Sequence, residues 1–120
     1  MSFYSHRGES LDAPENTMAA FNLSLARGAD GFECDVYLTL DRHLVCIHDP
    51  TTGRVTGQGE NLNVTNSTLS QLQALDVGAW KGPGYAGERI PLLSEVLDLA
   101  RDGCKIIVEI KQDAASGVIP

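Results

Sequence analysis

This 120-residue sequence has seven polar residues in or beside short apolar segments. Their side chains can carry acid–base, metal-binding or phosphate-binding chemistry. They are His6, Arg7, Glu33, Asp35, His48, Glu109 and Lys111. Histidine exchanges protons near neutral pH, carboxylates hold divalent cations, and arginine and lysine bind phosphate oxygens. These residue types could therefore work together if the fold brings them to one place.

Glu33 and Asp35 are two positions apart in an apolar run. Side chains alternate across a strand, so both carboxylates point to one face, about 6.5 Å apart, where they can hold one divalent ion. Oxygen ligands suit Mg²⁺ or Ca²⁺ better than zinc. Glu109 and Lys111 repeat the spacing in a second apolar run. The alternative is that Glu33 and Asp35 are solvated charges on an edge strand, but both lie among apolar residues, and buried carboxylates need partners or a metal, which favours the metal site.

The other polar residues each allow two interpretations. His6 and His48 could be a general acid and base, or they could simply bond to backbone carbonyls where strands end. Arg7 could bind phosphate or be an exposed cation. Asp49 could orient a neighbouring histidine or bind a metal-held water, or it could begin a turn. Glu15 could support the site, although a carboxylate is also favoured there by a helix dipole.

Alternating strand and helix patterns predict how these residues are positioned. We expect strands at 3–5, 31–38, 44–48 and 105–111, and helices after Pro14-Glu15-Asn16-Thr17, after Thr68 and over about 93–103. Asn16 or Thr17 can cap the first helix, and Thr68 with Gln71 resembles a capping box. Such alternation predicts an α/β fold on parallel strands, whose carboxyl ends meet at one rim. Because the polar residues follow those ends, we expect them to converge.

Composition limits the classes of partner. The net charge of −7 argues against nucleic acid as a partner, and no apolar run reaches the roughly 20 residues of an integral membrane segment. The three cysteines have no metal-binding spacing, and Cys34 and Cys46 are expected as buried thiols. With no leader visible, the free cysteines favour a cytoplasmic location. A secreted or periplasmic one stays open if the chain is trimmed.

Six motifs, in order along essentially the whole chain, resemble those of glycerophosphodiester phosphodiesterases. They are His6-Arg7-Gly8, Pro14-Glu15-Asn16-Thr17, Glu33-Cys34-Asp35-Val36, His48-Asp49 with Arg54 and Thr56, Ala86-Gly87-Glu88-Arg89-Ile90-Pro91, and Val108-Glu109-Ile110-Lys111. The resemblance implies a TIM-type (β/α)8 barrel, of which residues 1–120 supply about the first four strands. It also implies hydrolysis of a glycerophosphodiester, a small-molecule substrate, to glycerol 3-phosphate and an alcohol.

By the same resemblance, each of the seven residues receives a role. Glu33, Asp35 and Glu109 would hold the divalent cation, Mg²⁺ or Ca²⁺; Arg7 and Lys111 would bind phosphate; His6 and His48 would share the catalytic acid and base roles. Glu15 and Asp49 would support them. A hydroxyl of the glycerol could attack first and give a cyclic phosphate before water completes the reaction.

Two departures from the family pattern bear on these expectations. The segment Leu92-Leu93-Ser94 stands where the family commonly has a threonine cap, so a looser helix start is expected. A complete barrel takes about 250 residues, and half a barrel leaves open strand edges that favour homo-oligomers. Alternatives are therefore a non-catalytic half-barrel fragment that binds metal or phosphate, or an assembly element. A lyase of the phospholipase-D-like class that acts on sphingolipids is a further one.

Overall fold

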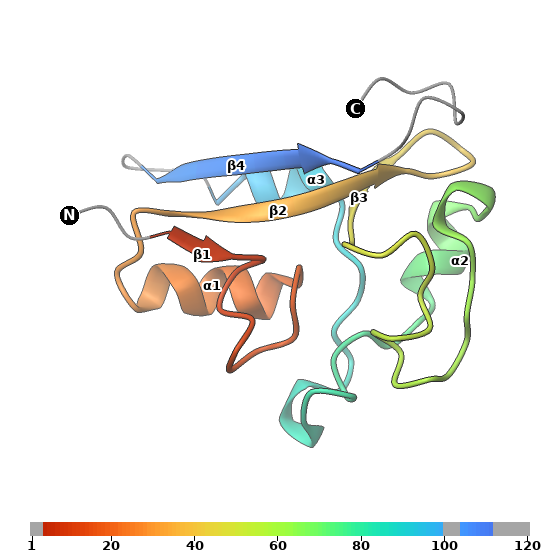
Figure 1. The fold of residues 1–120 in the computed structure, drawn as a ribbon, viewed down its shortest axis with the longest axis horizontal. Coiled ribbons are helices and arrows are strands. Elements are labelled where there is room, and N and C mark those ends of the chain that lie inside the picture. The colour runs from red at the N-terminus through yellow and green to blue at the C-terminus, as the bar shows by residue number, and fades with distance from the viewer. Residues whose placement is uncertain (1–3, 100–103, 112–120) are drawn as a thin grey trace.

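A computed structural model describes residues 4–99 and 104–111 of the chain (Figure 1). Its elements are β1 (Tyr4–His6), α1 (Met18–Ala26), β2 (Gly31–Leu38), β3 (Leu44–Cys46), the 3₁₀ helix η1 (Val64–Asn66), α2 (Leu69–Gln73), the 3₁₀ helix η2 (Pro83–Tyr85), α3 (Leu93–Leu97) and β4 (Lys105–Ile110). The strands lie where the sequence predicts them, to within a residue or two at their ends. The predicted end of the last helix, near Gly103, lies outside the described residues.

Strand β2 is the centre of the sheet. It pairs in parallel with β1, where His6 lies opposite Glu33, and in parallel with β4, where Asp35 lies opposite Glu109. Parallel pairing places the carboxyl ends of the three strands at the same edge of the sheet. The convergence that the sequence predicts therefore occurs for the residues of β1, β2 and β4.

The expectation that the third strand is also parallel is wrong. Strand β3 is antiparallel to β2, with Val36 opposite Cys46 and Leu38 opposite Leu44. The reason is the short connection over 39–43, since parallel neighbours need a crossover of a dozen or more residues. His48 consequently lies beyond the end of a hairpin strand, and Ile47 N–H still donates to the carbonyl of Asp35 (2.9 Å). The described sheet thus has three parallel strands.

The helices α1 and α3 cover the face of β2 that carries Phe32, Cys34 and Val36. Phe21 of α1 stacks on Phe32 with ring centroids 4.5 Å apart, and Val96 of α3 is buried in the same cluster. Cys34 and Cys46 are buried here as free thiols, as expected. Because side chains alternate along a strand, Glu33 and Asp35 point to the opposite face, away from the helices.

Local capping signals act as the sequence predicts. Thr17 caps α1, since its side chain accepts from Ala20 N–H, and Thr68 with Gln71 forms a capping box at α2. Asn16 does not cap α1. At α3 no side chain of Leu92 can cap, but Glu95 accepts from Leu92 N–H (2.9 Å), so the start of this helix keeps half of a capping box.

Residues 47–92 form a long excursion between β3 and α3, on the right and at the bottom of Figure 1, and pack with Tyr37 of β2 and Val45 of β3 into a second hydrophobic core. Its buried residues include Val55, Val64 and Leu72. The excursion reaches back to the loop after β1, because Lys81 Nζ donates to the carbonyl of Ser10 (2.8 Å). No helix in the described part of the chain has the length and apolar character needed to span a bilayer.

Candidate functional site

Three carboxylates meet on one face of the sheet, two from the middle of β2 and one from the carboxyl end of β4. Glu33, Asp35 and Glu109 each offer an oxygen, and these oxygens all lie within 4.8 Å of one another. Asp35 is fully buried, the Glu33 side chain is 14% exposed, and Glu109 is exposed. The two-residue spacing supplies the first pair, and the register between Asp35 and Glu109 supplies the third carboxylate.

The electrostatics of this cluster fit a divalent cation. Glu33 Oε1 and Asp35 Oδ1 are buried and have no hydrogen-bond partner among the described residues. Burial, followed by the charge of Asp35 and the contact with Glu109, raises the pKa of Glu33 to about 7. Crowded, buried carboxylates without partners are costly, and a hard cation satisfies oxygen donors of this kind. The three side chains could therefore hold such an ion.

Two cations flank the carboxylates. Lys111 Nζ lies 3.0 Å from Glu109 Oε1 and 3.6 Å from Asp35 Oδ1, and Arg7 Nε lies 3.5 Å from Asp35 Oδ2. The hydrogen bond from Lys111 lowers the pKa of Glu109. Arg7 has a left-handed backbone (φ 58°), at the tight turn that follows β1. Both cations are therefore placed where they could also contact an anionic substrate.

Sequence reasoning missed the role of Asn16, which it treated as a possible helix cap. Asn16 is buried; its Nδ2 donates to Asp35 Oδ2, and its Oδ1 accepts from Asp35 N–H, both at 3.1 Å. Its own N–H donates to the carbonyl of Arg7 (3.0 Å), and its φ is 55°, a conformation that asparagine tolerates well. The signal for this role was its place in the Pro14 to Thr17 motif.

The two histidines differ in setting. His6 Nε2 lies 3.6 Å from Glu33 Oε2, and its side chain is 65% exposed. His48 Nδ1 lies 2.9 Å from Asp49 Oδ1, so of the three interpretations of Asp49 the structure favours orientation of a histidine. Glu15 lies 3.4 Å from Arg7 Nη1 and contacts Arg54, so it packs against the site rather than serving only a helix start.

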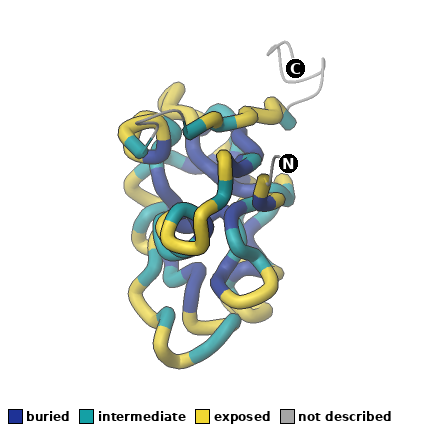
Figure 2. The backbone as a smooth tube through the Cα atoms, turned by 90° about the vertical axis from the view of Figure 1, so that its left-hand side faces the viewer, coloured by how far each residue is buried: buried dark blue, intermediate teal, exposed yellow. Residues whose placement is uncertain are grey.

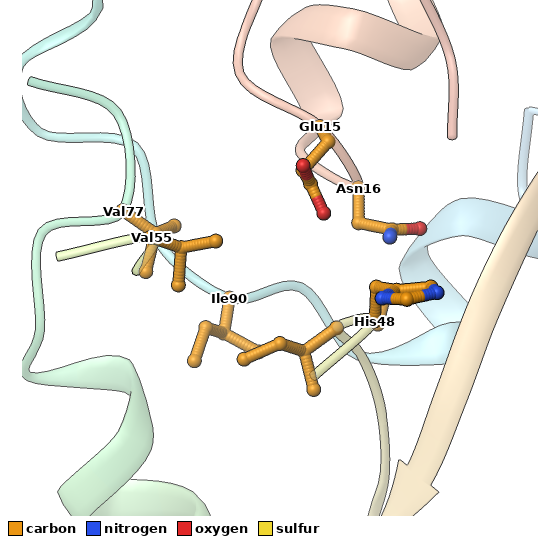
Figure 3. A pocket seen from close by; sticks show the side chains of 8 residues that line it. Glu15, Asn16, His48, Val55, Val77 and Ile90 are labelled. Carbon is orange, nitrogen blue, oxygen red and sulfur yellow. The ribbon is translucent and has the colours of Figure 1, made fainter. Parts of the chain in front are cut away.

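A narrow pocket opens beside His48 (Figure 3). Glu15, Asn16 and His48 form its polar side, and the apolar side chains of the excursion, Val55, Val77 and Ile90, face them. The polar groups of the site thus border the second hydrophobic core. Residues that the sequence places in two separate motifs, Pro14 to Thr17 and His48-Asp49, are brought to one wall of this pocket.

The fold and the site together define an α/β domain with a cluster of carboxylates and cations on one face of a mainly parallel sheet. Residues 6–119 match the model of the glycerophosphoryl diester phosphodiesterase family, and the chain belongs to this family. A glycerophosphodiester phosphodiesterase of Caldanaerobacter subterraneus is 47% identical over 116 residues, which cover 96% of this chain and 45% of that protein.

Solved structures agree in fold. The crystal structure of a glycerophosphodiester phosphodiesterase from Agrobacterium tumefaciens superimposes with a TM-score of 0.87 at 36% identity, covering 93% of this chain and 48% of that one. An Oleispira antarctica phosphodiesterase, in complex with the product sn-glycerol-3-phosphate, gives 0.88 at 34% identity, covering 96% and 46%. The chain therefore has the TIM-barrel fold of these enzymes, in part, and spans about half of their length.

Proposed function

We propose that this chain carries the metal- and phosphate-binding part of a glycerophosphodiester phosphodiesterase site, which hydrolyses a glycerophosphodiester to glycerol 3-phosphate and an alcohol. The observation that carries the proposal is the cluster of three carboxylate oxygens within 4.8 Å of one another, flanked by Arg7 and Lys111. The family match and the relatives' names support the choice of substrate. The product in the Oleispira enzyme supports it further.

Glu33, Asp35 and Glu109 would hold the cation, and their oxygen donors favour Mg²⁺ or Ca²⁺. When bound, the metal would neutralise negative charge that develops on the phosphate. Arg7 and Lys111 bind phosphate oxygens and place the phosphorus beside the carboxylate cluster. Preorganised positive charge of this kind is usually the largest single contribution to catalysis.

His6 and His48 share the proton transfers. One accepts the proton of the attacking oxygen, which belongs to water or to a neighbouring hydroxyl of the glycerol, and the other gives a proton to the departing alkoxide. Asp49 orients His48 through the contact at Nδ1. Asn16 fixes Asp35 by its two hydrogen bonds and so keeps one metal ligand in place.

Turnover of glycerophosphocholine tests this proposal. We expect activity that requires a divalent cation and falls about 10²–10⁴-fold in His48→Ala, the range for loss of a general acid or base, with a comparable fall in Glu33→Ala. His43→Ala is the matched control, because His43 is exposed in the hairpin turn. Undiminished activity in EDTA would rule out the metal assignment, and undiminished activity of His48→Ala would rule out its catalytic role.

A second function, binding without turnover, is favoured by the exposed strand β4, which pairs only with β2 among the described residues. A partly open site could bind metal or phosphate without enclosing a substrate. Calorimetry with Mg²⁺ separates the two functions: heat of binding that Glu33→Gln abolishes, together with no turnover by the unsubstituted chain, would favour the binding module.

A further inference from the structure

Arg54 joins two acidic residues that come from distant parts of the chain. Its Nε donates to Asp49 Oδ2 at 2.8 Å, and its Nη1 and Nη2 donate to the two oxygens of Glu15, also at 2.8 Å each. A bidentate contact between guanidinium and carboxylate fixes direction as well as distance. Arg54 therefore determines where both carboxylates point.

One of these carboxylates controls His48. Hydrogen bonds from Arg54 and His48 lower the pKa of Asp49, so its carboxylate is ionised near neutral pH and can only accept. With Oδ1 at 2.9 Å from Nδ1, a neutral His48 ring donates from Nδ1 and therefore has its lone pair on Nε2. The side-chain tautomer of His48 thus depends on where Asp49 is held.

The other carboxylate leads back to the metal-binding cluster. Glu15 Oε2 lies 3.4 Å from Arg7 Nη1, and Arg7 Nε lies 3.5 Å from Asp35 Oδ2. Charges of opposite sign therefore alternate in one chain of contacts, in the order Asp35, Arg7, Glu15, Arg54 and Asp49, and the chain ends at the imidazole ring of His48. Without Arg54 the like charges of Glu15 and Asp49 would repel each other, because Arg54 lowers the pKa of Glu15 while the nearby negative charge of Asp49 acts in the opposite direction.

We propose that Arg54 is a positioning residue, which holds Asp49 against His48 and so keeps Nε2 of His48 free to take a proton. The catalytic meaning of this inference rests on the proposed function. A purely structural salt bridge is the alternative. The Arg54 side chain is 41% exposed, and ion pairs at such sites contribute little to stability. The conformation of His48, rather than the stability of the fold, is therefore the property to measure.

The test is the tautomer of His48, read from ¹⁵N–¹H correlation spectra of the metal-free chain at a pH well above the ordinary histidine pKa of about 6.5. We expect the proton on Nδ1 in the unsubstituted protein and a shift toward Nε2–H, the form free imidazole prefers, in Arg54→Gln. Arg54→Lys should restore the Nδ1–H form only in part, because lysine is a point charge that cannot hold both carboxylates in a fork.

Arg42→Gln is the matched control, since it removes the same charge from the exposed turn before β3. Identical His48 spectra in Arg54→Gln and Arg42→Gln would overturn the proposal. Because the readout needs neither metal nor substrate, an inactive protein with the expected tautomer change would contradict the proposed function and leave the role of Arg54 intact. In an active protein, we expect Arg54→Gln to lower kcat roughly 10–100-fold, the range found for residues that orient a site.

Discussion

At the scale of residues, the site depends on buried polar groups that satisfy one another. Asp35 has no exposed surface, and its contacts are Asn16 on one side and the cations Arg7 and Lys111 on the other. Of these three side chains only Asn16 forms hydrogen bonds of ordinary length with Asp35, both at 3.1 Å, since the cations lie at 3.5 and 3.6 Å. Asn16 is thus the residue that defines the position of Asp35.

We expect Asn16→Ala to lower the free energy of unfolding by about 1–3 kcal/mol, because it leaves the buried N–H and one carboxylate oxygen of Asp35 without partners. Urea unfolding measures this loss, and Asn66→Ala, at an exposed asparagine of η1, is the control. Equal stability of the two variants would contradict the assigned role. Mg²⁺ affinity should fall in the Asn16 variant alone.

Glu33 predicts a pH dependence in the metal-free protein. Its pKa is raised from 4.5 to about 7, so the folded state binds the proton more tightly than the unfolded chain. The contribution of Glu33 to the free energy of unfolding is therefore complete below about pH 4.5 and is lost as the pH rises through about 7. Urea unfolding at several pH values in EDTA should show this decline, and Glu33→Gln should lack it. A decline of equal size in both proteins would exclude Glu33 as its source.

At the scale of elements, short caps and turns present the motifs. Helix α1 begins at Thr17, directly after Glu15 and Asn16, so the cap fixes the backbone from which both side chains reach the site. Thr17 is fully buried, and its hydroxyl also donates to the carbonyl of Pro14 (2.6 Å). The position of the site therefore depends on a helix end rather than on a helix face.

Thr17→Ala is expected to lower the free energy of unfolding by about 0.5–2 kcal/mol, the usual cost of losing an N-cap. Thr17→Ser keeps the hydroxyl and should lose less. Thermal or urea unfolding of the two variants compares them directly. If the serine variant proves as unstable as the alanine variant, packing of the methyl group rather than capping determines the role of this residue.

At the scale of the whole molecule, strand β4 exposes apolar side chains to solvent. Its residues are mostly exposed, including the apolar Ile107, Val108 and Ile110, and Figure 2 shows exposed chain next to the grey trace that ends at the C-terminus. Pairing with a second copy through this edge remains the proposal for a homo-oligomer. Two copies would contribute six parallel strands, twice the three described here, and so could not close an eight-stranded barrel between them.

We expect the 120-residue chain to associate in a concentration-dependent way and Ile110→Lys to weaken that association, because a charged edge residue opposes strand pairing. Light scattering over a range of concentrations gives the mass. Leu40→Lys is the control, since Leu40 is an exposed leucine (59%) in the turn between β2 and β3, away from the edge of β4. An unchanged mass in Ile110→Lys, or a monomer throughout, would exclude pairing through β4.

The sequence by itself determined those features that depend on near neighbours. The strand over 31–38, the caps at Thr17 and Thr68, and the carboxylate pair of Glu33 and Asp35 all follow from periodicity or from contacts within a few residues. The parallel pairing of β1, β2 and β4 was also predictable from the sequence, because helices separate these strands along the chain. Local hydrogen bonds and side-chain alternation suffice for predictions of this kind.

Only the tertiary structure decided the bond between Asn16 and Asp35 and the link from Arg54 to Glu15, which spans 39 residues. Contacts between distant segments depend on how turns and two separate cores place the segments, and periodicity carries no information about that. The seven residues of the candidate site, whose roles stay predictions, were therefore predictable as candidates from strands and motifs. The residues that hold them in place were not.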